Sequence, residues 1–169
     1  MPSSWLVTHE HLLPQAGDAL DVACGNGRHA LWLAERGLRC YAVDRDAAAI
    51  ERLKEEAARR GLPLVAHVLE LEQGDVHFSP PTYDLIVVVR YLHRPLMPTL
   101  IQALRPGGLL VYETFTRAQA ARGKPTNPAF LLESGELLTL VEPLEILASR
   151  EGDYDSGMIA SVIARRGAI

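Results

Sequence analysis

Residues 20–28 read LDVACGNGR, and this stretch decides the fold class of the chain. The apolar segment 19–23 predicts a buried strand, while Gly25 and Gly27 predict a tight turn into a helix over about 28–35. Glycine lacks a Cβ, so the backbone of such a turn can approach a ligand closely, and the helix that follows points its amide groups at that ligand. The stretch therefore predicts a strand–turn–helix unit with a ligand site at the carboxyl end of its strand.

Apolar segments alternate with segments of helical period from residue 19 onward. Four further strands are expected, at 39–43, 64–69, 85–89 and 108–112. Helices are expected at 47–60, between the Asp46 cap and Gly61, and from Pro95 to residue 104. This alternation is typical of a parallel sheet covered by helices.

The C-terminal part of the chain breaks this rhythm. Segments 144–148 and 158–164 are predicted to form two strands, joined by a polar turn over 151–157. A purely parallel sheet would need a crossover helix at this point, and none is predicted. The last strand is therefore expected to run antiparallel.

The composition is that of an ordinary globular protein. The chain has 169 residues, of which 48% are hydrophobic and 22% are charged, so residues 1–169 are predicted to form a single domain. A net charge of −4 gives no global positive field of the kind that binds nucleic acid through its phosphates. RNA is therefore disfavoured as a partner, although local basic patches can still occur.

Neither a membrane segment nor a metal site is predicted. No apolar run approaches the ~18 residues of a membrane helix, and the first residues lack the features of a signal peptide. Cys24 and Cys40 lie in apolar segments without the spacing of a zinc site, which predicts two buried thiols in a reducing compartment. We expect a cytoplasmic protein.

The glycine turn alone leaves two cofactor classes open, because residues 25–30 also satisfy the G-x-G-x-x-A dinucleotide fingerprint. Asp21 favours S-adenosylmethionine over NAD, since it stands where a dinucleotide-binding strand is normally apolar and could orient the turn near the ammonium group of the ligand. Asp44 ends the second strand, where a carboxylate can bind a ribose diol, as it also does in NAD folds. The antiparallel hairpin is the third feature that favours S-adenosylmethionine.

With these features the chain resembles the class I S-adenosylmethionine-dependent methyltransferases over nearly its whole length. Within that class it is similar to the compact bacterial enzymes grouped with the tellurite-resistance methyltransferases, which share Cys-Gly-Asn-Gly-Arg. The matching motifs are LDVACGNGR at 20–28, Asp44, Glu70-Leu71, YDLIV at 83–87 and LRPGGLL at 104–110. The resemblance implies an α/β, three-layer, Rossmann-like sheet of seven strands in the order 3-2-1-4-5-7-6, with strand 7 antiparallel.

The resemblance also implies the cofactor, S-adenosylmethionine, and the product S-adenosylhomocysteine. Glu70 and Leu71 are expected at the adenine, with Arg45 stacked on it, and solvated side chains are the alternative for Glu70 and Arg45. Ala23 departs from the family pattern by replacing its first glycine, and Glu70 departs from it by replacing an aspartate. The predicted cofactor-binding set is Asp21, Ala23, Cys24, Gly25, Gly27, Arg28, Asp44, Arg45, Glu70, Leu71 and Arg90.

Catalytic residues are harder to select. Methyl transfer is an in-line displacement, so positioning supplies much of the rate and a base is needed only for a protonated acceptor. Residues after the fourth and fifth strands should face the crevice at the carboxyl edge of the sheet, which makes His93 and Glu113 the candidates. A histidine bonded to the backbone at a helix start is the alternative for His93.

The function predicted from these features is methyl transfer to a small-molecule acceptor, with the loop 114–130 shaping its pocket. One alternative is a non-catalytic S-adenosylmethionine-binding subunit that supports a partner. Another is an RNA methyltransferase, which is disfavoured because residues 90–93 read RYLH where enzymes that methylate base amino groups carry N-P-P-[YFW]. A NAD-dependent oxidoreductase is the remaining alternative. A short N-terminal segment leaves the site exposed, and a homodimer could cover it.

Overall fold

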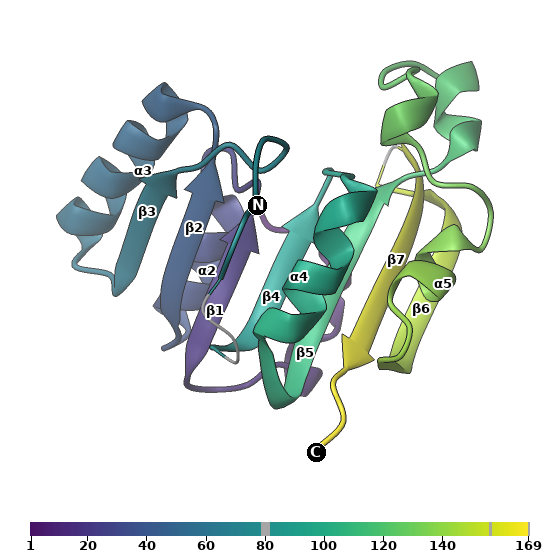
Figure 1. Cartoon of the computed structure of the whole chain (residues 1–169). Helices are drawn as coiled ribbons and strands as arrows, with labels where there is room; N and C mark the ends of the chain where they lie inside the picture. The colour runs from purple at the N-terminus through teal and green to yellow at the C-terminus, as the bar shows by residue number, and fades with distance from the viewer. Residues whose placement is uncertain (79–81, 156, 169) are drawn as a thin grey trace.

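One seven-stranded sheet forms the centre of the computed structural model, which describes residues 1–78, 82–155 and 157–168 (Figure 1). The strands lie in the order β3-β2-β1-β4-β5-β7-β6. β7 runs antiparallel to both β5 and β6, and the other neighbouring pairs are parallel, so the predicted sheet is confirmed. The strands are β1 (Asp18–Val22), β2 (Arg39–Asp44), β3 (Leu64–Val68), β4 (Tyr83–Val89), β5 (Leu104–Phe115), β6 (Glu145–Tyr154) and β7 (Gly157–Arg165).

Helices cover both faces of this sheet and complete three layers (Figure 1). One buried apolar cluster joins the sheet to the first three helices, and a second joins it to the last two. The helices are α1 (Ser4–Thr8), α2 (Arg28–Glu35), α3 (Ala47–Arg60), α4 (Met97–Ala103) and α5 (Glu136–Leu140). Short 3-10 turns lie at Glu10–Leu12, Arg94–Leu96, Arg117–Ala121 and Pro128–Phe130.

β4 shows why a strand in this position is apolar at nearly every residue. Leu85 and Val87 belong to the cluster beneath α1, α2 and α3, whereas Ile86 and Val88 belong to the cluster beneath α4 and α5. All four side chains are fully buried. Each contributes roughly 1.5–3 kcal/mol through burial, so both faces of the strand stabilise the fold.

The C-terminal hairpin differs in one respect from the prediction. Strand β6 continues to Tyr154, which pairs with Gly157, so the polar segment expected as a turn over 151–157 is mostly strand. β6 is the edge strand of the sheet and is largely exposed, and therefore its polar residues do not mark a turn. β7 lies between β5 and β6 and is buried from Ile159 to Ala164, as predicted.

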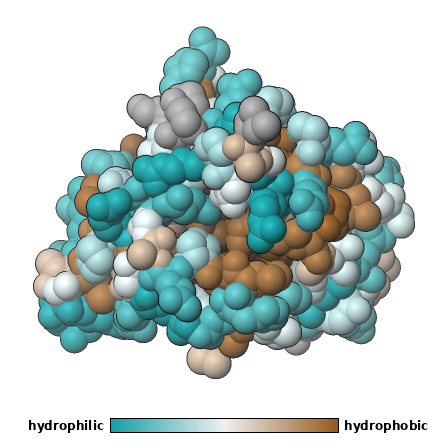
Figure 2. Space-filling view, turned by 90° about the horizontal axis from the view of Figure 1, so that it is seen from below, coloured by the Kyte–Doolittle hydropathy of each residue, from teal (hydrophilic) through white to brown (hydrophobic). Residues whose placement is uncertain are grey.

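Hydrogen bonds and ion pairs connect neighbouring strands at the amino edge of the sheet, at the bottom of Figure 1. Asp84 accepts a hydrogen bond from the backbone N–H of Asp18 at 2.9 Å and pairs with Arg105 at 2.6 Å. Asp84 thus has a structural role at the edge of the sheet opposite the ligand edge. Seen from below, hydrophobic side chains gather in the centre and right of this face, surrounded by hydrophilic ones (Figure 2). Among the described residues, no helix is both long and apolar enough to cross a membrane.

Candidate functional site

A cavity of about 710 Å³ lies at the carboxyl edge of the sheet. Its walls come from the residues that follow β1, β2, β3 and β4, and from the end of β5 with the loop after it. The volume falls within the range of roughly 300–1,000 Å³ of small-molecule sites. The lining residues are Ala23, Asp44, Arg45, Leu69, Glu70, Leu71, Glu72, Arg90, Tyr91, Leu92, Thr114, Phe115, Lys124, Pro125, Thr126, Asn127 and Phe130.

The turn after β1 contains three residues with left-handed backbone. Ala23, Gly25 and Gly27 have φ angles of 54°, 55° and 78°. A Cβ on Gly27 would stand 2.4 Å from the side chain of Leu53 on α3, so this glycine is needed for packing. A Cβ on Gly25 would meet no protein atom within 4 Å, which leaves space beside that residue. The two glycines therefore serve different purposes, although the sequence analysis predicted the same purpose for both.

Asp44 connects this turn to the start of α3. One carboxylate oxygen accepts the N–H of Gly25 at 2.9 Å, and the other accepts the N–H of Asp46 at 2.8 Å. The side chain also lines the cavity. An ionised carboxylate offers about four acceptor positions, so two remain for hydroxyl groups of a ligand.

Asp21 lies behind the turn and is not among the residues that line the cavity. Its side chain is buried and accepts the N–H of Ala30 in the first turn of α2 at 3.1 Å. Burial raises the pKa of this carboxyl from 3.8 to about 7, and the hydrogen bond from Ala30 offsets part of that increase. The predicted orienting role fits this geometry, whereas the predicted place beside a ligand ammonium is not seen.

The other predicted cofactor residues divide into two groups. Ala23, Asp44, Arg45, Glu70, Leu71 and Arg90 line the cavity. Cys24, Gly25, Gly27 and Arg28 belong to the turn but are not among the lining residues. Arg28 donates to the backbone oxygen of Met1 at 3.1 Å, and the thiol of Cys24 is buried.

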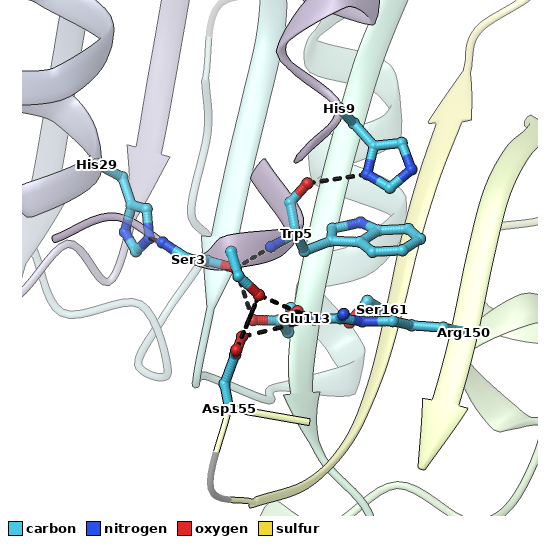
Figure 3. Close-up of polar contacts among 9 residues, drawn as sticks. Ser3, Trp5, His9, His29, Glu113, Arg150, Asp155 and Ser161 are labelled. Atoms are coloured by element: carbon cyan, nitrogen blue, oxygen red, sulfur yellow. Dashed lines mark hydrogen bonds and ion pairs between the residues drawn. The ribbon is translucent and has the colours of Figure 1, made fainter. Parts of the chain in front are cut away.

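Glu113 is not among the residues that line the cavity, contrary to the prediction, and points instead toward Ser3, Arg150 and Ser161 (Figure 3). Its carboxylate accepts hydrogen bonds from the hydroxyls of Ser3 at 2.8 Å and Ser161 at 2.5 Å. Arg150 lies 3.4 Å from it, with its guanidinium over the rings of Trp5 and Tyr154. Glu113 thus anchors the N-terminal segment to β5 and β7, a role that depends on Ser3, which is 110 positions away in the sequence.

His93 also lies outside the cavity lining. Its Nδ1 stands 3.7 Å from a carboxylate oxygen of Glu72, which does line the cavity. Any contribution of His93 to the chemistry would therefore act through the orientation of Glu72. Direct proton transfer to or from a bound acceptor is not supported by this position.

Comparison with known proteins identifies the family. Residues 19–108, more than half of the chain, match the model of the methyltransferase domain. The chain belongs to the class I S-adenosylmethionine-dependent methyltransferases. S-adenosylmethionine is the cofactor of this family.

Two relatives of this methyltransferase are named for different RNA acceptors. The chain is 31% identical over 106 residues to ribosomal RNA small subunit methyltransferase C of Alcanivorax borkumensis, covering 59% of this chain and 33% of the relative. It is 34% identical over 104 residues to tRNA 5-carboxymethoxyuridine methyltransferase of Escherichia coli, covering 57% of this chain and 40% of the relative. The chain thus spans less than half the length of these two relatives.

The fold of the methyltransferase also matches solved structures. TehB from Haemophilus influenzae superposes with a TM-score of 0.80 at 18% identity, covering 98% of this chain and 62% of that one. At this identity the likeness supports the fold alone.

Sequence reasoning did not assign a role to Tyr91, although it named the segment that contains it. The Tyr91 hydroxyl is buried in the cavity wall and has no hydrogen-bond partner among the described residues. Burial, together with the nearby carboxylates of Glu72 and Glu70, raises the pKa of Tyr91, so the phenol stays protonated. The Tyr91 hydroxyl is therefore a protonated donor next to the carboxylate of Glu72. The signal in the sequence was a tyrosine two residues after the end of a buried strand.

Proposed function

We propose that residues 1–169 form a single methyltransferase domain that binds S-adenosylmethionine in the cavity and methylates a small-molecule acceptor. The observation that carries this proposal is Asp44, whose carboxylate is held by two backbone N–H groups and keeps acceptor positions free toward the cavity. A ribose diol supplies the two hydroxyl donors that match those positions.

The remaining lining residues suit the other parts of this cofactor. Leu69 and Leu71 offer an apolar wall for the adenine, and Glu70 offers an acceptor for its amino group. Arg90 is a cation for the carboxylate of the cofactor, and it is held at a φ of 60°, which a non-glycine residue seldom adopts. The bound cofactor supplies an electrophilic methyl group on a positively charged sulfur, and its transfer leaves neutral S-adenosylhomocysteine.

The chain itself contributes positioning and the exclusion of water. Leu92 and Phe115 supply apolar surface to the cavity wall, which also contains the side chain of Tyr91. Neither candidate base lines the cavity, which favours an acceptor that is already deprotonated or that loses its proton to solvent.

RNA is the second candidate acceptor because two relatives carry RNA methyltransferase names. The acidic net charge of −4 argues against it, since RNA binding draws on many uncompensated cations. A non-catalytic subunit would bind the cofactor without turnover.

Titration calorimetry tests the cofactor. We expect S-adenosylhomocysteine to bind in the micromolar range or tighter, about −8 kcal/mol or more favourable, and NAD to bind no better than background. Tight binding of NAD without binding of S-adenosylhomocysteine would reject the proposal. Release of S-adenosylhomocysteine with a small-molecule extract separates an enzyme from a non-catalytic subunit, and release with total RNA alone selects the RNA alternative.

A further inference from the structure

The loop between β5 and α5 is a closed and anchored structure. Its two ends pair, with the N–H of Leu132 bonded to the oxygen of Phe115 and the N–H of Arg117 bonded to the oxygen of Leu132, both at 2.9 Å. Loops whose ends meet in this way are compact and are often functional. We call residues 117–131 the rim loop.

Two buried or half-buried side chains fix the rim loop from either side. Gln119 donates to the backbone oxygen of Lys124 at 3.1 Å and accepts the N–H of Met158 at 2.9 Å. Arg94 donates to the backbone oxygen of Leu131 at 2.9 Å and pairs with Glu136. The wall that the rim loop adds to the cavity is thus positioned before any ligand arrives, which lowers the entropic cost of binding.

The rim loop has three cationic side chains, and two of them are paired with acidic residues. Arg117 pairs with Glu133 at 2.9 Å, and Arg122 pairs with Asp153 at 2.8 Å. Lys124 has no acidic partner among the described residues, and it is the one cation of the three that lines the cavity. Acidic side chains thus neutralise Arg117 and Arg122, whereas Lys124 is available to an anionic ligand.

Two phenylalanine side chains line the same cavity as Lys124. Phe130 projects from the rim loop, lines the cavity and remains 46% exposed, although it is a large apolar side chain. Phe115 stands at the end of β5 and also lines the cavity, with the guanidinium of Arg90 5.8 Å from the centre of its ring. A planar apolar ligand would cover both rings and remove apolar surface from water.

Resting on the proposed function, we propose that the methyl acceptor is a small aromatic acid, with its ring against Phe115 and Phe130 and its anionic group at Lys124. Arg90 and Lys124, two of the cavity cations that lack an acidic partner among the described residues, then have separate anions, because Arg90 is assigned to the carboxylate of the cofactor and Lys124 to that of the acceptor. The pairing of Arg117 and Arg122 with acidic residues disfavours an RNA backbone, which would require these cations to be free.

A series of ligands that differ only in charge tests the proposal. 4-Hydroxybenzoate, 4-hydroxybenzamide and 4-hydroxybenzylamine are an anion, a neutral compound and a cation on the same ring. Each is titrated into the protein with and without S-adenosylhomocysteine, with binding followed by ligand-observed NMR. We expect the anion to bind about tenfold more tightly than the amide, and the amine to bind most weakly.

Two variants assign this preference to its residue. Lys124→Gln should remove most of the tenfold preference for the anion and leave the affinity of the amide unchanged. Arg122→Gln, on the same loop but paired with Asp153, is the matched control and should leave the preference intact. Phe130→Ala should weaken all three ligands together.

The outcomes separate the two proposals. Equal binding of anion and amide, an intact preference in Lys124→Gln, or no binding of 4-hydroxybenzoate at millimolar concentration overturns the aromatic-acid acceptor. Methylation of RNA in place of aromatic acids overturns it as well. Failure of S-adenosylhomocysteine to bind rejects the proposed function, and the charge series without that ligand still tests the subsite at Lys124.

Discussion

Two groups of charged side chains lie toward the carboxyl edge of the sheet, and they differ in how their charges are balanced. The Glu113 cluster (Ser3, Glu113, Arg150, Asp155 and Ser161) joins each charged group to a partner within hydrogen-bond distance (Figure 3). In the cavity, Arg45, Arg90 and Lys124 have no acidic partner among the described residues. Glu113 belongs to the first group, and Phe115, two residues later on β5, lines the cavity. Nearby positions of one strand therefore contribute to both sites.

The difference indicates which charges are available to a ligand. Removing charges from water is unfavourable unless partners replace the lost hydration, and the Glu113 cluster provides those partners within the chain. The cavity cations are exposed and remain hydrated until an anion reaches them. Charge balance therefore distinguishes a structural carboxylate such as Glu113 from groups that await a ligand, and the following predictions test this distinction.

The largest change in stability is expected for Asp21, because its carboxyl is buried and accepts a hydrogen bond from a single backbone donor. Its pKa is 3.8 in an unfolded chain and about 7 in the fold, so between these values the unfolded chain loses a proton that the folded chain keeps. The contribution of Asp21 to stability should therefore fall as the pH rises from 4 to 7, by about 4 kcal/mol, while buried His29, whose pKa is lowered to about 4, contributes in the opposite direction in both proteins. In Asp21→Asn this loss should be absent, as measured by urea unfolding at several pH values. Parallel pH profiles for the two proteins would show that Asp21 is ionised and stabilised in the fold.

Glu113→Gln should reduce the free energy of unfolding by about 3 kcal/mol, because Arg150 loses a buried partner and one acceptor oxygen becomes a donor. The exposed Glu145 on β6 provides the control, and Glu145→Gln should change stability by less than about 0.5 kcal/mol. The affinity for S-adenosylhomocysteine should stay within about twofold in both variants. A loss of affinity without a loss of stability in Glu113→Gln would place this carboxylate in the ligand site after all.

Asp44→Ala should weaken binding of S-adenosylhomocysteine by about 10- to 150-fold, which corresponds to roughly 1.5–3 kcal/mol for a charged hydrogen bond. Asp46→Ala is its control, because Asp46 caps α3 through the N–H of Ala49 without lining the cavity. That variant should lose about 1 kcal/mol of stability and keep its affinity. Equal affinities in both variants would mean that Asp44 only supports the turn.

Ala23→Gly should give the smallest effect. Ala23 has a φ of 54°, in the left-handed region where a Cβ costs roughly 1–2 kcal/mol and glycine costs nothing. The greater freedom of glycine in the unfolded chain offsets about half of this gain, so we expect a net stabilisation of about 0.5 kcal/mol, visible as a small rise in Tm. A destabilised variant would show that the methyl group of Ala23 contributes packing that outweighs the backbone strain.

Local features of the chain predicted most of the fold. The glycine turn after β1, the Asp46 cap and Gly61 end of α3, and the fully apolar β4 are set by backbone freedom, capping and burial within a few residues. The strand order came from the family resemblance. The extent of β6 was missed because an edge strand tolerates the polar residues that elsewhere mark a turn.

For the site, the sequence by itself determined which residues follow each strand, and so placed Asp44, Glu70 and Arg90 at one edge of the sheet. Only the tertiary structure decided which of these side chains have partners. Glu113 meets Ser3 and Ser161 across 110 and 48 positions, and Arg122 of the rim loop meets Asp153 of β6, so neither pairing follows from local spacing. Electrostatic interactions depend on distance in space, and the separation of two charges along a chain does not define that distance until the chain has folded.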